Sequence, residues 1–340
     1  MGRGNACFKL SFATVVVIVI AGTAAYADKN NLTVSNQLGV NYLPMSVMKR
    51  GRLIEKHAEA LGLGTVSVTF VKLGSGTATN DALLSGSVDV AASGTPTMIQ
   101  IWSATAGSPG SVMGIGALGS LPFLLNTTNP SVKSIADFTE QDRIAVPAAK
   151  VGLQATLLQM ECAKLFGEAN YAKLDHLTVT MAHPDALSAL LSGGRGSITA
   201  HFGQSPFQDA ELRDAKVHTV LTSHDVLRGP ASGELLVTTA TFRNANPKLY
   251  KAVFAALEET IRIINSDKRR AAQIYVEDAQ VKESPEVIEK IISGPLVEYS
   301  SVPNGVMKYA DFMHKVGRIK RRPEKWSDIF FPEVHDRPGS

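Results

Sequence analysis

Short apolar runs alternate with longer amphipathic stretches along most of the chain. In the first third, strands are predicted at Leu32–Asn36, Val66–Leu73 and Val88–Ala92, and helices at Met45–Leu61 and Thr77–Ser85. The resulting order, β-α-β-α-β, is typical of a parallel sheet with right-handed crossovers. The pattern therefore predicts an α/β unit at the start of the fold.

The same order recurs further along the chain. Val112–Leu125 is apolar, dotted with glycine and broken by Pro122, and it indicates a strand that leaves the first unit and enters a second one. In the second unit, strands are predicted at Arg143–Val146, His176–Thr180, Ile198–Phe202 and Val217–Leu221, and helices at Val151–Phe166, Asp185–Ser192 and Ser205–Arg213. After a loop at Asp225–Gly233, the extended segment Glu234–Thr239 can return to the first unit. Two crossings between the units predict a hinge.

The remaining chain is predicted to be helical. A long amphipathic helix begins at Pro247, and shorter helices are predicted at Lys268–Asp278, Pro285–Ser293 and Val306–Val316, before Trp326, which we expect to dock on a lobe as a structural staple. We expect residues 28–117 and 232–340 to form lobe I with the C-terminal helices, and residues 118–231 to form lobe II.

One short segment occurs twice. Residues 82–86 and 189–193 both read Ala-Leu-Leu-Ser-Gly, and each copy predicts a helix that ends at a glycine and is followed by a short strand. The strands lead to Thr95-Pro96 and Ser205-Pro206, where we expect the hydroxyl to cap the next helix. Because open α/β sheets bind ligands at the carboxyl ends of their strands, the repeat predicts two such edges that face one cleft.

The first 27 residues have the composition of a secretory signal peptide. A basic start with Arg3 and Lys9 is followed by the apolar run Phe12–Ala21 and by Ala25-Tyr-Ala27, an A-x-A cleavage motif. The alternative is an uncleaved membrane anchor, but the apolar run is shorter than the roughly 18–20 residues that span a bilayer. We expect an exported, periplasmic protein.

Charge and cysteine content exclude several classes of function. The net charge is +3, and both charges of the first 27 residues are basic, so the rest of the chain is nearly neutral, which disfavours nucleic-acid binding. Beyond the expected signal only Cys162 remains, in an apolar helical stretch, so we expect a buried thiol and no internal disulfide. The chain has no Gly-x-Ser-x-Gly, His-Glu-x-x-His or Cys-x-x-Cys motif, and we expect no enzyme activity, no cofactor and no metal.

A set of short motifs in a fixed order carries a family resemblance. They are Gln37-x-Gly39-x-x-Tyr42-Leu-Pro44, Leu84-x-Gly86-x-Val88-Asp89-x-Ala91, Ile135-x-Asp137-Phe138 before Ile144–Pro147, Asn246-Pro247, and a closing motif from Gly305 to Lys320. Together they resemble solute-binding proteins of ABC transporters, in the nitrate/sulfonate/taurine group that is related to pyrimidine-precursor proteins of the thiamine route. The resemblance covers nearly the whole chain after the signal.

The resemblance implies the type II periplasmic binding protein fold, an α/β fold of two lobes with mixed, mainly parallel sheets. It also implies a monomer that captures a small anionic or heterocyclic solute, such as a sulfonate or nitrate, for a membrane permease and its ATPase. Two alternatives stay open: a receptor that feeds a sensor, and a pyrimidine-synthase-like enzyme, although such enzymes use a cysteine-rich motif that this chain lacks.

Three departures from the family pattern concern the ligand. Thr199 stands in the second copy of the repeat where Asp89 stands in the first, Pro147–Lys150 replaces a phosphate-loop-like serine, and His201–Pro206 replaces an aromatic-x-Pro pair. The ligand can therefore differ from those of the relatives.

Loops after the first and third strand of each lobe, with the return loop, supply the candidate ligand-binding residues. These are Gln37, Gly39, Tyr42, Ser93, Gly94, Thr95, Thr97, Ala148, Lys150, Gly152, His201, Phe202, Gln204, Ser205 and Ser232. No arginine has a clear place in this cleft, so an anion would rely on backbone N–H groups and helix N-termini, with Lys150 or His201 as the cationic help. An uncharged heterocycle could instead stack on Tyr42 or Phe202.

Several of these residues also have a purely structural explanation. Thr95 and Ser205 can cap helices without touching a ligand, Tyr42 can pack between the lobes, and His201 can be a buried histidine with a backbone partner. Lys150 can be a solvated loop charge, and Asp89 is expected to support the backbone of its turn.

The signal is predicted to be cut between Ala27 and Asp28, because Ala25 and Ala27 are the small residues that a signal peptidase requires. Intact-mass analysis of periplasmic protein should therefore show a chain that starts at Asp28. A mature chain that still carries Met1 would refute the assignment.

Overall fold

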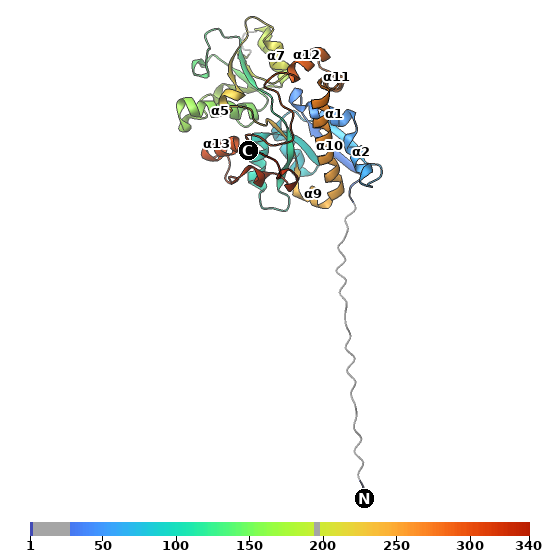
Figure 1. Ribbon diagram of the computed structural model, residues 1–340. Coiled ribbons are helices and arrows are strands. Elements are labelled where there is room, and N and C mark those ends of the chain that lie inside the picture. The colour runs from blue at the N-terminus through green and yellow to red at the C-terminus, as the bar shows by residue number, and fades with distance from the viewer. Residues whose placement is uncertain (3–27, 194–197) are drawn as a thin grey trace.

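The computed structural model describes residues 1–2, 28–193 and 198–340 (Figure 1). The expected signal segment lies outside the described residues, as does most of the loop that follows the second copy of the repeat. Within the described ranges, no helix combines the length and hydrophobicity of a bilayer span.

The chain forms two five-stranded sheets. The strands of the first sheet lie in the order β2-β1-β3-β10-β4, with bounds Asn31–Asn36 for β1, Ser67–Lys72 for β2, Val90–Gly94 for β3, Val112–Gly119 for β4 and Glu234–Thr239 for β10. Strands β1, β2 and β3 pair in parallel, whereas β10 is antiparallel to both β3 and β4.

The second sheet repeats this plan in the order β7-β6-β8-β5-β9. Its strands are β5 at Leu124–Thr127, β6 at Ile144–Val146, β7 at Thr178–Thr180, β8 at Ala200–Phe202 and β9 at His218–Thr222. Here β5 is the strand that runs against its neighbours, β8 and β9. The mixed two-sheet α/β arrangement predicted from the sequence is confirmed.

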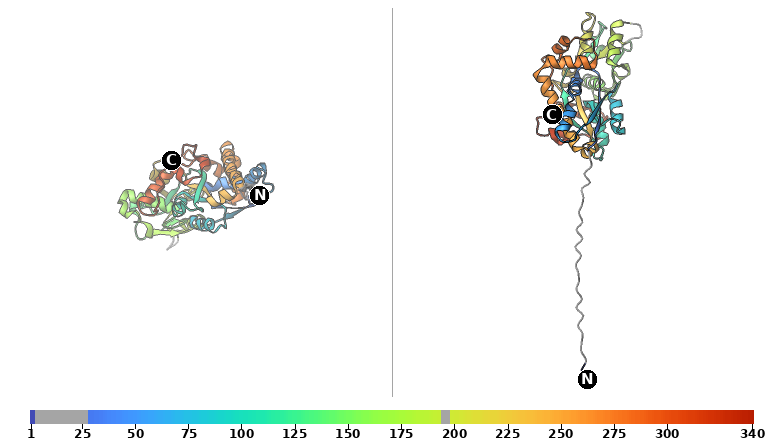
Figure 2. Two further views of the ribbon diagram at one scale, coloured as in Figure 1. Left: turned by 90° about the horizontal axis from the view of Figure 1, so that it is seen from below. Right: turned by 90° about the vertical axis from the view of Figure 1, so that its right-hand side faces the viewer.

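Helices cover both sheets. Their bounds are Leu43–Arg50 (α1), Leu53–Ala60 (α2), Gly76–Ser85 (α3), Thr95–Thr105 (α4), Leu153–Phe166 (α5), His183–Ser192 (α6), Phe207–Glu211 (α7), Ser223–Leu227 (α8), Ala240–Ala245 (α9), Pro247–Ser266 (α10), Lys268–Ala279 (α11), Pro285–Ile292 (α12) and Val306–Lys315 (α13). The left view of Figure 2 places the green middle of the chain at one end of the molecule and the blue and orange parts at the other.

One helix prediction and one loop prediction were wrong. The helix predicted at Met45–Leu61 is broken into α1 and α2 at Arg52, whose φ of 49° is left-handed, and the break turns Leu53 into the core. The segment predicted as a loop from Asp225 belongs in part to α8, because the Thr222 hydroxyl accepts a hydrogen bond from the Asp225 N–H and starts a helix there.

The C-terminal helices are amphipathic because their apolar faces are buried in the core of the first lobe. Helices α1, α2, α10 and α11 share one buried cluster with the first sheet, in which Leu32, Val34, Val253 and Leu257 are fully or almost fully buried. Figure 1 shows α1, α2 and α10 grouped on the right of the molecule. The aromatic ring of Trp326 packs on Phe330 and His335, in agreement with the structural role expected for it.

The helices of the two repeat copies end as predicted: Gly86 and Gly193 close α3 and α6 with left-handed φ angles of 73° and 61°.

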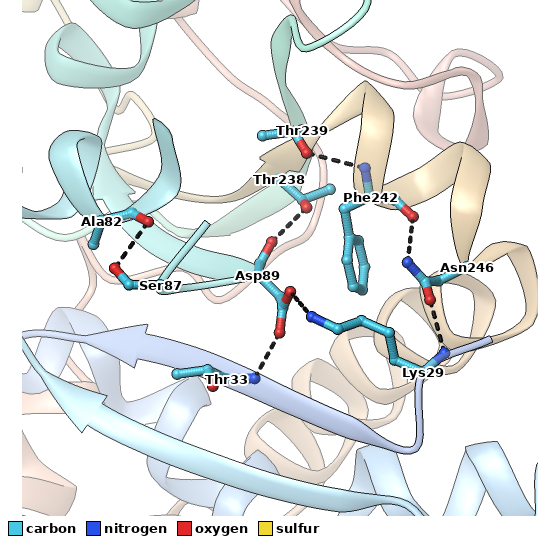
Figure 3. Close-up of polar contacts among 9 residues, drawn as sticks. All are labelled: Lys29, Thr33, Ala82, Ser87, Asp89, Thr238, Thr239, Phe242 and Asn246. Carbon is cyan, nitrogen blue, oxygen red and sulfur yellow. Dashed lines mark hydrogen bonds and ion pairs between the residues drawn. The ribbon is translucent and has the colours of Figure 1, made fainter. Parts of the chain in front are cut away.

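The structure also explains why the second copy of the repeat can have Thr199 where the first has Asp89. Asp89 donates its backbone N–H to the Thr33 carbonyl and accepts the Thr33 N–H on its carboxylate at 3.0 Å (Figure 3). Thr199 makes the same pair of bonds to Arg143, with its hydroxyl accepting the Arg143 N–H at 3.1 Å.

Asp89 should therefore tolerate threonine better than alanine. Asp89→Ala leaves the partly buried Thr33 N–H without its acceptor, and we expect a loss of about 1–3 kcal/mol in the free energy of unfolding. Asp89→Thr keeps an acceptor and loses only the ion pair to Lys29, whose side chain is 45% exposed, so a loss of about 0–1 kcal/mol is expected. Urea denaturation measures both, and equal losses would contradict the equivalence of Asp89 and Thr199.

Candidate functional site

A cavity of about 240 Å³ lies between the facing edges of the two sheets. Its wall is formed by Gln37, Leu38, Tyr42, Lys72, Leu73, Gly74, Gly76, Gly94, Thr97, Pro147, Ala148, Gly152, Leu153, Gln154, Ala182, His183, Gln204 and Glu234. Almost all of these residues follow the carboxyl ends of parallel strands in one sheet or the other. The cavity is therefore where the fold class predicts a ligand site.

Glu234 reaches the cavity by a different route. It is the first residue of β10 and pairs with Gly94, the last residue of β3. Because β10 runs antiparallel to β3, its amino end lies at the edge where the other strands have their carboxyl ends. The carboxyl group of Glu234 thus stands on the same wall as the side chains of Lys72 and His183 and the amides of three glutamines.

Seven of the fifteen candidate residues lie on the cavity wall: Gln37, Tyr42, Gly94, Thr97, Ala148, Gly152 and Gln204. The other eight do not: Gly39, Ser93, Thr95, Lys150, His201, Phe202, Ser205 and Ser232. Phe202 is fully buried in the core, and Lys150 is exposed, with its backbone carbonyl accepting a hydrogen bond from Gln159.

The expected helix caps at Thr95 and Ser205 were wrong. Helix α4 already begins at Thr95, and the Thr95 hydroxyl donates across to the Ser232 carbonyl at 2.6 Å, so that it ties α4 to the return loop. Helix α7 begins after Pro206, and the Ser205 hydroxyl accepts from the Gln208 side chain at 3.3 Å. Neither side chain accepts a backbone N–H as a cap would.

Gly39 and Gln204 bring the two sheets into direct contact beside the cavity. The Gln204 side-chain amide donates to the Leu38 carbonyl, and the Val40 N–H donates to the Ser205 carbonyl at 2.8 Å. A Cβ atom on Gly39 would lie 2.2 Å from the Gln204 nitrogen, and the φ of Gly39 is 119°, so this position requires glycine. These contacts join the first and second halves of the fold at the cavity.

Eleven wall residues were missed: Leu38, Lys72, Leu73, Gly74, Gly76, Pro147, Leu153, Gln154, Ala182, His183 and Glu234. The sequence contained a signal for several of them, since Lys72 is the last residue of β2, Leu73 and Gly74 come directly after it, and Ala182 and His183 come shortly after β7. The candidate residues came only from the loops after the first and third strand of each lobe, although the loop after the second strand lies at the same edge of the sheet. Lys72, and not Lys150, is the lysine on the wall.

The Glu234 carboxyl is held largely in its neutral form. Burial raises its pKa to about 8, against a smaller opposing effect of the Asn41 amide, which donates to Oε2 at 3.2 Å. Burial, and then the neighbouring Glu234, also raise the pKa of the Tyr42 phenol well above its usual value. At neutral pH the Glu234 carboxyl and the Tyr42 phenol therefore each present a hydroxyl group near the cavity. Because both are mostly uncharged, they do not repel an anion.

His183 is neutral as well. Burial, and then the neighbouring His201, hold its pKa well below the usual value. Its ring stacks on Phe207 with centroids 5.7 Å apart, and its Nδ1 lies 2.8 Å from Nε2 of His201. Of the two histidines, His183 lies on the cavity wall, whereas His201 is fully buried behind it.

No model of a protein family matches the chain, and no curated protein matches its sequence. Solved structures do match. The alkanesulfonate-binding protein SsuA from Xanthomonas axonopodis pv. citri, bound to MOPS, superposes with a TM-score of 0.66 at 16% identity, over 87% of this chain and 96% of that one. The conserved Candida albicans CA3427 gene product, described as having the generic periplasmic binding protein structural fold, gives 0.63 at 14% identity over 86% and 92%.

The chain has the periplasmic binding protein fold. The periplasmic nitrate-binding protein NrtA from Synechocystis PCC 6803 is also similar, with a TM-score of 0.64 and 15% identity over 88% of this chain and 84% of that one. The fold expected from the resemblance is therefore confirmed, with the cavity between its two sheets.

The raised pKa of Glu234 predicts a dependence of stability on pH. Between about pH 4.5 and pH 8 the folded chain binds more protons at Glu234 than the unfolded chain does, so the contribution of this group to stability falls as the pH rises. We expect a slope of up to about 1.4 kcal/mol per pH unit in that window, and none from this group on either side of it. Glu234→Gln should lack this slope, as denaturant unfolding at several pH values will show. Parallel pH profiles of the two proteins would contradict the assignment.

Proposed function

We propose that this chain is the extracytoplasmic solute-binding component of an ABC importer and that it holds a small solute in the cavity between the two sheets. The observation that carries the proposal is the cavity itself, walled by the strand ends of both sheets and closed by contacts between them. Its volume of about 240 Å³ is below the ~300–1,000 Å³ of sites for drug-sized ligands, which favours a small solute.

The charges of the wall favour a ligand with anionic oxygen atoms, such as a sulfonate or nitrate. Lys72 brings a cation to the end of β2, and Glu234 is held mostly protonated, so it can donate a hydrogen bond to an anion. The amides of Gln37, Gln154 and Gln204 add further donors. A heterocycle remains the second ligand class because the Tyr42 ring lies on the wall, whereas Phe202 is unavailable for stacking.

The wall does not favour the enzyme alternative. In the described part of the chain, the wall contains neither serine nor cysteine. Cys162 is buried in α5, and burial raises the pKa of its thiol to about 12, which suppresses the nucleophilic thiolate.

We propose that the protein is a periplasmic monomer that delivers its ligand to a permease and ATPase. We also propose that residues 28–117 and 232–340 form one lobe and that residues 118–231 form the other. Delivery to a sensor instead remains the second possibility.

Ligand release requires the lobes to separate, and two crossings can act as the hinge. The first runs from Gly119 to Leu124, between β4 and β5, and the second from Arg228 to Gly233, between α8 and β10. Opening would break the Gln204–Leu38 contact. It would also strain the bonds of Arg318, which follows α13 and donates to Thr156 and Gln159 of α5 at 2.8 and 2.7 Å.

Titration calorimetry with ethanesulfonate, MOPS, nitrate and cytosine tests the ligand class. We expect binding by at least one of the three anions and a smaller radius of gyration in small-angle scattering at saturation, because a ligand that contacts both lobes favours the closed form. Thr97→Val removes a wall hydroxyl without changing the side-chain shape and should weaken binding about two- to tenfold.

Thr95→Val is the matched control. It removes a hydroxyl two residues away that bonds to Ser232 and lies off the wall, so we expect reduced stability and unchanged affinity in the folded protein. Binding of cytosine alone would move the proposal to the heterocycle class. Loss of affinity in Thr95→Val with none in Thr97→Val would contradict the placement of the site.

A further inference from the structure

Three ionisable side chains form a row that runs from the cavity wall into the protein interior. Oε1 of Glu211 is hydrogen-bonded to Nδ1 of His201, and Nε2 of His201 lies 2.8 Å from Nδ1 of His183. Glu211 and His201 are 0% exposed and His183 is 6% exposed. Only His183 lies on the cavity wall, and among the described residues its Nε2 has no hydrogen-bond partner.

Separate elements hold this row in place. Glu211 is the last residue of α7, His201 the middle residue of β8 and His183 the first residue of α6. Asn126 of β5 donates to Oε2 of Glu211 at 2.9 Å, and Phe207 stacks on the ring of His183. Each ring is thus fixed before any ligand arrives, as preorganised binding requires.

The position of the protons follows from the cost of buried charge. In the described part of the chain, no lysine or arginine makes an ion pair with Glu211. A net negative charge on the row would therefore be buried without compensation, which is costly in a low-dielectric interior. A neutral row avoids this cost.

Three proton arrangements make the row neutral. A protonated Glu211 donates to Nδ1 of His201, which then donates from Nε2 to Nδ1 of His183. If the proton moves to His201, the Glu211–His201 ion pair again leaves His201 Nε2–H donating to His183. If it moves on to His183, that ring carries a proton on both nitrogens. In all three arrangements Nε2 of His183 bears a proton, and the low pKa of His183 disfavours the third.

We infer that Glu211 and His201 act as positioning residues that hold His183 as a hydrogen-bond donor, with its Nε2–H available to the cavity, so that the ligand must present an acceptor oxygen there. This inference rests on the proposed function and narrows its ligand class. Anionic oxygen atoms of a sulfonate, carboxylate or nitrate satisfy the donor. A ligand that offers only N–H groups at this point would meet N–H against N–H and be rejected.

Nitrogen-15 NMR of the full mature chain, labelled at histidine, measures the proton directly at pH 7. The chain has eight histidines, and His183→Gln identifies the signal of interest by its loss. We expect a protonated Nε2 on His183 in the wild-type protein without ligand. An unprotonated Nε2 overturns the inference whatever the protein binds, so this result is independent of whether the proposed function holds.

Two variants separate positioning from simple packing. Glu211→Gln can keep its oxygen toward Asn126 and donate from its nitrogen to Nδ1 of His201, so we expect the His183 proton to stay on Nε2 and ethanesulfonate affinity to stay within about twofold. His201→Phe preserves a ring but removes the donor to His183 Nδ1, so the His183 proton should redistribute between its two nitrogens. An unchanged His183 signal in folded His201→Phe would show that His201 does not position the proton.

Ethanesulfonate then tests the ligand contact. His183→Phe keeps the stacked ring and removes the donor, and we expect about a ten- to hundredfold loss of affinity, the range for a hydrogen bond to a charged group. In the wild type, the Nε2–H signal of His183 should shift on titration. If ethanesulfonate binds and neither change occurs, the donor does not face the ligand. If no anion binds at all while Nε2 is protonated, the proposed function fails and the proton assignment stands.

Discussion

One antiparallel strand in each sheet determines where the cavity between the sheets can form. Strands β10 and β5 insert beside β3 and β8 and run against them, and each follows a crossing from the other sheet. A strand inserted in this way has its amino end at the edge where its neighbours have their carboxyl ends. The two crossings and both sets of strand-end loops therefore meet around one cavity, and Glu234 is carried into it as the first residue of β10.

The two sheets are copies in plan and differ in detail. Asp89 and Thr199 hold the backbone N–H of the neighbouring parallel strand in the same way, one with a carboxylate and the other with a hydroxyl. A substitution that looks like the loss of a family feature in the sequence therefore preserves the physical interaction. The loops on the cavity wall have diverged further, since one sheet contributes Lys72 and Glu234 and the other His183.

How much of this the sequence could predict depends on the range of each signal. Periodicity and glycine-terminated helices located most strands and helices, and the repeat pointed to the correct edges of the sheets. Adding the second strands would also have pointed to Lys72 and His183. To predict that Glu234 lies on the wall, one would have to know the direction of β10. To predict that His201 is buried, one would have to know which elements pack against β8. The cap predictions failed because the chain enters α4 and α7 one or two residues away from the place that the Thr-Pro and Ser-Pro pairs suggest.

The central claim is that a solute with acceptor oxygen atoms binds between the strand ends of the two sheets. A crystal structure of the mature chain grown with a bound sulfonate tests it most directly. We expect density for the anion inside the cavity, with one of its oxygen atoms within hydrogen-bond distance of His183 Nε2 and its headgroup in reach of Glu234. A sulfonate seated elsewhere, for example in the surface groove beside Arg321 and Arg322, with the cavity left to solvent, would contradict it.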